Sequence, residues 1–161
     1  MAHNEFLVAW LKDAYAMEKG IAESLERQVE LAKDHPTVQS GIQRHLDATN
    51  GHAETVKECL ESLGESPSGV KSAMASVGGM VQGMMPGAAK DDLLKAAMQD
   101  YSAEHMEIAS YRSLILSATE LGHADIVQKC QTILEDEQAM ALWLEESMPM
   151  LTREAILQGQ T

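Results

Sequence analysis

The sequence predicts an all-α protein: a single domain spanning residues 1–161, built as an antiparallel bundle of four long helices. Three observations predict it. Helix-forming Ala, Leu, Met, Glu, Gln and Lys are plentiful. Four stretches carry apolar residues at alternating spacings of three and four, which is the pattern of a helix face packed against other helices. No stretch shows the strict alternation of a half-buried strand.

The first two helices are expected on either side of a break at Asp34-His35-Pro36. Asn4 can cap the first helix. Its inward stripe is Leu7, Leu11, Ala14, Glu18, Ile21 and Leu25. Pro36 suits the first turn of the second helix, which is expected to end near Gly64. The stripe of this helix is Val38, Ile42, His45, Thr49, His52, Val56, Cys59 and Leu63.

The third helix is expected to start at or next to Asp91 and to stop at Gly122. Its stripe is Leu94, Ala97, Tyr101, Glu104, Ile108, Tyr111, Ile115 and Ala118. The fourth helix is expected to end near Met148-Pro149, with residues 151–157 adding a short amphipathic tail. Its stripe is Ile126, Cys130, Ile133, Glu137, Met140 and Leu144.

A long connection, about residues 65–90, is expected to join the second and third helices. Residues 72–89 carry no charge and approach the length of a membrane span, but Gly78, Gly79, Gly83, Pro86 and Gly87 interrupt them. We therefore expect a crossover with a short methionine-bearing helix on the bundle. Its methionines are interpreted as core filler, with a soft-metal or partner surface as the alternative.

Polar groups that bind metals interrupt each of the four stripes near its middle. A buried, unpaired carboxylate is costly and needs a partner, a proton or a metal. Glu18 lies about 16 residues before the first break and His52 about 17 after it, so the helical rise brings them to nearly one level. Glu107 and Glu137 lie about 15 residues on either side of Gly122, and Glu104 is one turn from Glu107. The acids therefore converge at mid-height.

The candidate metal ligands are Glu18, His45, His52, Glu104, Glu107 and Glu137. A single histidine on such a stripe is usually a hydrogen-bonded core residue, but two that face carboxylates favour a metal site. Carboxylates with a few imidazoles suit iron or manganese. Cys59 and Cys130 lack CxxC spacing and lie on apolar stripes, so they are expected to be reduced core residues.

Charge and motifs restrict the remaining function classes. The net charge of -13, without a basic stripe, argues against nucleic-acid binding. The first five residues lack the basic start and apolar run of a signal peptide, which makes the cytoplasm the expected location. No nucleophile elbow, phosphate loop or dinucleotide fingerprint is present. The sequence specifies no reaction and no substrate.

Five segments of the chain are similar to one known family. They are residues 11–19 (LKDAYAMEK), 45–49 (HLDAT), 104–111 (EHMEIASY), 134–137 (LEDE) and 140–144 (MALWL). Through them, nearly the whole chain resembles the YciE/YciF-like branch of the ferritin-like superfamily. The resemblance implies a ferritin-like four-helix bundle, a candidate di-iron carboxylate site, a link to stress responses and a homodimer.

The chain departs from the family pattern at several site positions. Ala48 stands where the family tends to have a second acid after His-Leu, and His52 stands where it often has glutamine. The usual histidine three residues after the helical glutamate is replaced by Ser110 after Glu107 and by Met140 after Glu137. The site is therefore expected to bind one metal, to bind two weakly, or to be empty.

Two hypotheses follow. The first is a ferritin-like protein that binds iron, with manganese and zinc as alternatives, and that carries out oxygen or peroxide chemistry if two irons bind. The second is a metal-free helical module that acts through its surface or dimer interface, its core acids paired with histidines or sharing protons. Trp10, Trp143 and Leu142 lie off the stripes and favour a homodimer over a cage, unless both tryptophans complete the intrachain core.

Overall fold

Four long helices make up the part of the chain that the computed structural model describes, residues 4–68 and 91–159. They are α1 (Glu5–Leu31), α2 (Pro36–Ser62), α4 (Asp92–Glu120) and α5 (Ala124–Gly159). No strand occurs in these ranges, so the predicted all-α four-helix bundle is confirmed. None of the described helices has the length and apolarity that a membrane span requires.

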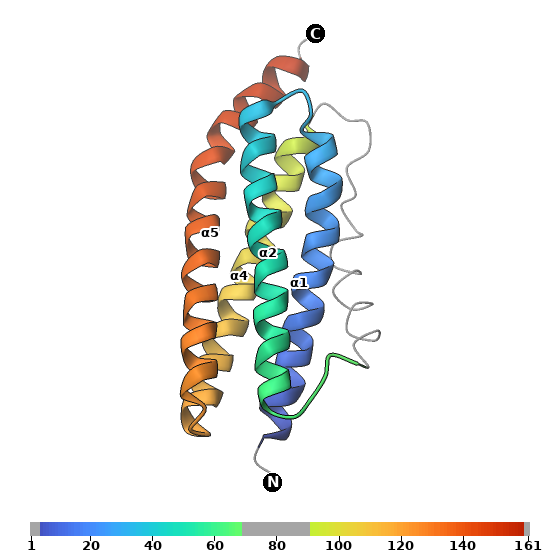
Figure 1. Cartoon of the computed structure of the whole chain (residues 1–161). Helices are drawn as coiled ribbons and strands as arrows, with labels where there is room; N and C mark the ends of the chain where they lie inside the picture. Colours follow the sequence, from blue (N-terminus) through green and yellow to red (C-terminus); the bar gives the residue numbers. More distant parts are fainter. Residues whose placement is uncertain (1–3, 69–90, 160–161) are drawn as a thin grey trace.

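The helices form a square in which neighbours run antiparallel (Figure 1). α1 packs against α2 and α4, and α5 packs against α4 and α2. α2 ends beside the start of α1, whereas α4 begins at the opposite end of the bundle (Figure 1). The end of α2 and the start of α4 therefore lie at opposite ends of the bundle, which is the arrangement that the predicted crossover requires. The methionine-bearing helix predicted within residues 72–89 lies outside the described residues.

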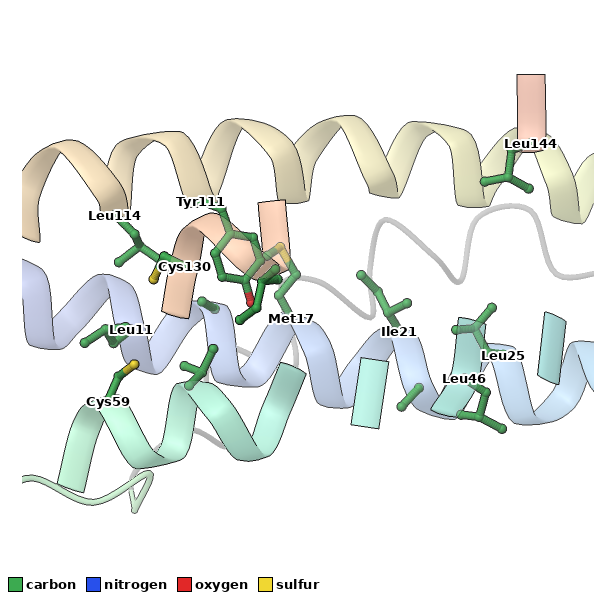
Figure 2. Close-up of a cluster of buried hydrophobic side chains, with 14 of the residues drawn as sticks. Leu11, Met17, Ile21, Leu25, Leu46, Cys59, Tyr111, Leu114, Cys130 and Leu144 are labelled. Atoms are coloured by element: carbon green, nitrogen blue, oxygen red, sulfur yellow. The ribbon is translucent and has the colours of Figure 1, made fainter. Parts of the chain in front are cut away.

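The predicted stripes line the core. Every stripe residue of α1 is buried, and so are most of those on the other helices. The exceptions are half-buried: Leu63, Leu94, Tyr101, Ile115 and Met140. Figure 2 shows how Leu11, Met17 and Leu114 meet Tyr111 and the two cysteines inside the bundle. The heptad-like spacing therefore identified the inward face of each helix.

The predicted helix ends are largely confirmed. Pro36 occupies the first turn of α2, where its missing N–H leaves no helical hydrogen bond unmade. Gly64 and Gly122 follow α2 and α4 with φ of 76° and 78°, which glycine adopts without a Cβ clash. Asn4 precedes α1 but makes no capping hydrogen bond through its side chain, and its Oδ1 lies 3.2 Å from His123 Nε2 instead.

The predicted end of the fourth helix at Met148-Pro149 is wrong, because α5 continues through Pro149 to Gly159. Proline removes one helical hydrogen bond, so the helix beyond it needs tertiary support. Leu151 supplies part of that support by packing into the core. Glu154 adds an ion-pair contact to His35, with Oε1 3.1 Å from the ring Nδ1. The expected tail is therefore the last part of α5.

Cys59 on α2 and Cys130 on α5 are buried free thiols, as expected from their stripes. The spacing in the sequence did not show that they are neighbours. The side chains of the two cysteines point toward each other inside the bundle (Figure 2), and the interaction with Cys130 lowers the pKa of Cys59. They lie between α2 and α5, at the end of the core nearest the α4–α5 turn.

Candidate metal centre

The structure brings five of the six predicted ligands into two overlapping groups in the middle of the bundle. One group is Glu18, His52 and Glu137, and the other is His45, Glu104 and Glu137. Within each group, one ligand atom per residue lies within 4.8 Å of the others. Glu137 belongs to both groups, so a single carboxylate connects two possible half-sites.

The helical repeat explains this arrangement. His45 and His52 are separated by two turns of α2, so they lie on one face at two heights. Glu18 on α1 reaches the level of His52, whereas Glu104 on α4 reaches the level of His45. Glu137 on α5 lies between them. Glu18 and His52 therefore lie at one level, as the residue counts predicted, whereas Glu107, which the counts matched with Glu137, belongs to neither group.

His52 is oriented by contacts on both ring nitrogens. Its Nδ1 lies 2.8 Å from Glu137 Oε1 and 3.8 Å from Glu18 Oε2, inside the bundle. Its Nε2 lies 3.1 Å from the exposed Asp136 Oδ2. In the neutral ring, an Nε2–H that donates to Asp136 leaves the Nδ1 lone pair directed at the two glutamates, as metal-binding histidines require.

Glu18 is positioned by Tyr111, whose hydroxyl donates a short hydrogen bond to Glu18 Oε1. The other oxygen, Oε2, has no hydrogen-bond partner among the described residues and faces His52. Tyr101, also on α4, is half-buried and packs edge-on against His105 at 4.5 Å between ring centroids. Tyr111 therefore supports the site, and Tyr101 contributes to packing.

The second group has the short contact between His45 Nε2 and Glu104 Oε1, at 2.9 Å. The two atoms do not form a directed hydrogen bond, and neither finds another such partner in residues 4–68 and 91–159. Two acceptor atoms that face each other at this distance need a proton or a cation between them. A proton on Glu104 or a cation held by both residues would therefore satisfy this contact.

Glu107 is fully buried beside these groups but belongs to neither of them. Neither of its oxygens has a hydrogen-bond partner in the described part of the chain. The same holds for both oxygens of Glu104 and of Glu137. So many unpaired buried oxygens are far from what a core usually tolerates, and they mark a place where a ligand would compensate.

Burial dominates the electrostatics of the acids. It raises the pKa of Glu18 to about 8 and that of Glu104 to about 11, and the charge of Glu137 adds to both shifts. Burial also raises the pKa of Glu107 well above its ordinary value, again with a contribution from Glu137. Glu137 differs: burial opposes its ionisation, but the close approach of His52 and other contacts outweigh burial and lower its pKa.

The two histidines are shifted in opposite directions. Burial lowers the pKa of His45 to about 4, so its ring is neutral and can donate a lone pair. Burial also acts to lower the pKa of His52, but the close contact with Glu137 and the other nearby carboxylates outweigh burial and raise the pKa to about 9. Without a metal, His52 is therefore an imidazolium and Glu137 is ionised at neutral pH. The other three buried glutamates, Glu18, Glu104 and Glu107, keep their protons.

This donor set fits a first-row divalent cation. Carboxylate oxygens with two imidazole nitrogens suit iron, manganese or zinc, and the shared Glu137 suits one ion or a bridged pair. Of the departures from the family pattern, His52 adds a ligand atom and the others add none. Ala48 is half-buried and has no oxygen to offer, Met140 is half-buried, and the Ser110 hydroxyl donates to the backbone of Met106.

Sequence reasoning missed three polar residues around the centre. Asp136 is not among the predicted ligands, although it contacts His52. Gln28 and Asp100 form a buried hydrogen-bonded pair, with Gln28 Nε2 2.8 Å from Asp100 Oδ1. The signal for Asp100 was available, because it lies one turn before Glu104 on the same helix face.

Comparisons with known proteins agree with this architecture. The family model described as domain of unknown function DUF892 matches residues 2–157. Protein YciF of Escherichia coli K12 is 26% identical over 144 residues, which cover 84% of this chain and 84% of that protein.

Three solved structures are similar over nearly their whole length. A Xanthomonas campestris protein has a TM-score of 0.82 at 31% identity, over 99% of both chains. YcfI of Rhodopseudomonas palustris has a TM-score of 0.76 at 30% identity, over 90% of this chain and 94% of that one. The E. coli stress protein YciF has a TM-score of 0.79 at 22% identity, over 93% of this chain and 96% of that one. At this identity the similarity supports the fold alone.

Proposed function

This chain belongs to the DUF892 family, in its YciE/YciF-like branch, and we propose that it binds one or two divalent metal ions in the core of the bundle. The observation that carries the proposal is Glu137, which is shared by two groups of buried ligand atoms that lack hydrogen-bond partners in the described chain. Iron is the metal we favour, with manganese and zinc as alternatives.

The residues around the centre would each have a defined task. Glu18 and Glu137 would bind one ion together with His52, and His45 and Glu104 would bind the other together with Glu137. A pair of irons would supply oxygen or peroxide reduction, which fits a cytoplasmic role in stress physiology.

Two neighbours would keep the ligands in place. Tyr111 would hold the orientation of Glu18, and Asp136 would hold that of His52. Glu107, fully buried beside both groups, would be a further carboxylate ligand, as the sequence predicted. The apolar residues around the groups would exclude bulk water.

A metal-free helical module is the second candidate, and the raised acid pKa values favour it. If Glu104 and Glu107 keep their protons at neutral pH, the core needs no cation for neutrality. The protein would then act through its surface, where Phe6 and Trp10 form an exposed aromatic pair with ring centroids 6.0 Å apart.

Metal content and a set of single substitutions distinguish the two candidates. The protein is purified without a metal-affinity tag, and bound iron, manganese and zinc are measured per chain. Titration of the demetallated protein with Mn²⁺ then gives the stoichiometry. His45→Ala and His52→Ala should each remove one of two ions, whereas Glu137→Ala should remove both. Glu135→Gln, which changes an exposed acid on the same helix, is the matched control.

The outcome that would contradict the proposal is a wild-type protein that retains no metal and takes up none. An unchanged stoichiometry in Glu137→Ala would contradict the shared-ligand geometry while leaving metal binding intact. Binding of a single ion that is lost in only one histidine variant would show which half-site is functional.

A further inference from the structure

A second polar site lies in the core between the metal centre and the end of the bundle where α4 begins. Gln28 and Asp100 are only 5% and 8% exposed. Gln28 Nε2 donates to Asp100 Oδ1, while Gln28 Oε1 has no hydrogen-bond partner in the described chain. An unpaired amide oxygen at this depth is costly, which indicates that it faces an occupant.

The pair lines a small cavity. Its volume is about 20 Å³, enough for one water-sized occupant. The other walls are mostly apolar and include Ala96, Trp143 and Leu144. A carboxylate and an amide oxygen would therefore be the main ligands of anything polar inside it.

A larger hollow of about 140 Å³ lies next to this cavity, at the end of the bundle. Leu93 and Leu151 line both spaces. The larger hollow is also lined by His35, Asp91, Asp92 and Glu154, so its mouth is polar. Two of these acids already have partners, because Asp91 is paired with Lys95 and Glu154 contacts His35.

One face of α4 connects the two hollows to the centre. Asp92, Asp100, Glu104 and Glu107 are all buried, and their spacings of eight, four and three place them along one side of the helix. Asp100 is one turn, about 6 Å of helical rise, from Glu104. Its charge contributes to the raised pKa of both Glu104 and Glu107, which shows that these groups interact.

We infer that this acidic face of α4 is the route by which a divalent cation moves between the bundle end and the metal centre, with Gln28 and Asp100 as an intermediate binding site. The inference rests on the proposed metal-binding function. A dehydrated ion is no larger than the occupant that the cavity admits, and its preferred ligands are the oxygens found there. The half-site with His45 and Glu104 is the one this route reaches first.

The ionisation of Asp100 is consistent with an intermediate cation-binding site. Burial raises the pKa of Asp100 to about 7, and the hydrogen bond from Gln28 opposes that shift. At neutral pH the carboxyl is therefore balanced between its two forms, and an arriving cation would favour the ionised form. The carboxyl can accept a cation and regain a proton after the cation has moved on.

The test is the rate of Mn²⁺ uptake and release by the full-length, demetallated protein. Uptake is followed by the loss of the EPR signal of free Mn²⁺ after rapid mixing, and release by adding excess chelator to the loaded protein. Asp100→Asn keeps the shape of the side chain and removes its charge. Ala96→Val narrows the same cavity without any change of charge. Asp13→Asn, an exposed acid of α1, is the control.

Asp100→Asn is expected to slow uptake and release alike by about tenfold, which corresponds to about 1.4 kcal/mol at the barrier. Ala96→Val should slow both rates as well, and the control should match the wild type. Because both directions slow together, the affinity and the number of bound ions should not change.

Three results would overturn the route. Wild-type rates in both variants would mean that the cavity holds an ordinary internal water. A lower stoichiometry in Asp100→Asn would make Asp100 a ligand of the centre itself. A wild-type protein that binds no Mn²⁺ would remove the proposed function as well, and this failure is recognised before any variant is made.

Discussion

Replacing Glu104 with glutamine should stabilise the metal-free protein at neutral pH. Glu104 is fully buried, and burial raises its pKa from 4.5 to about 11. In the unfolded chain the carboxyl ionises above pH 4.5, whereas in the folded protein it retains its proton up to about pH 11. Unfolding therefore releases a proton at pH 7, and the free energy of unfolding falls as the pH rises through this window.

The magnitude follows from the pH interval. Between pH 4.5 and pH 7, the free energy of unfolding falls by at most about 3 kcal/mol because of Glu104, at 1.36 kcal/mol per pH unit. Glutamine keeps the volume but cannot ionise, so Glu104→Gln should recover up to about 3 kcal/mol, equivalent to a rise in Tm of about 6–12 °C for a chain of this size. At pH 5 the gain should shrink below about 1 kcal/mol.

The assay is urea or thermal unfolding followed by circular dichroism, in the presence of a chelator, at pH 5 and pH 7. Glu23→Gln, which changes an exposed acid of α1, should leave the free energy of unfolding unchanged at both pH values. In the metal-saturated protein, Glu104→Gln should instead destabilise the native state, because it removes a metal ligand. If Glu104→Gln instead destabilised the metal-free protein at pH 7, Glu104 would be ionised and paired with His45, and the reasoning would be refuted.

Four further outcomes are expected. A chelator should lower the Tm of the protein as purified, since an ion at a hundred times its Kd stabilises the native state by about 2.7 kcal/mol, and an unchanged melt would favour the metal-free module. Gly41→Ala should destabilise by about 1–3 kcal/mol because a Cβ there would overlap the Trp143 ring, whereas Gly51→Ala, with open space around it, should stabilise by roughly 0.5–1 kcal/mol. A thiol reagent should label neither Cys59 nor Cys130 in the native protein and both after unfolding, because both are buried, and rapid native labelling would contradict their placement. Light scattering at several concentrations should give the mass of a homodimer; a monomer mass throughout would refute the dimer, and a particle of cage size would revive iron storage.

Much of the fold could be predicted from the sequence because it depends on local, periodic properties. The spacing of three and four identifies the inward face of a helix before its neighbours are known. Constant helical rise then converts residue counts from a turn into heights, and this predicted that Glu18 and His52 lie at nearly one level. Gly64, Gly122 and Pro36 marked helix ends through their own backbone preferences.

The end of α5 shows where local reasoning failed. Pro149 is unfavourable inside a helix, so the sequence predicted a stop there. Contacts from other parts of the chain outweigh that local cost, through the burial of Leu151 and the approach of Glu154 to His35. The effect of a proline on a helix therefore depended on residues more than a hundred positions away.

The sequence by itself determined which side chains enter the core and at what height, because face and rise are properties of a single helix. Only the tertiary structure decided which of them are lateral neighbours, because that depends on how each helix is rotated and packed against the others. The sharing of Glu137 between two ligand groups, the contact of Asp136 with His52 and the pairing of Gln28 with Asp100 all belong to this second kind. A height locates a residue along the bundle axis, but a metal site needs its ligand atoms within a few ångströms across that axis as well.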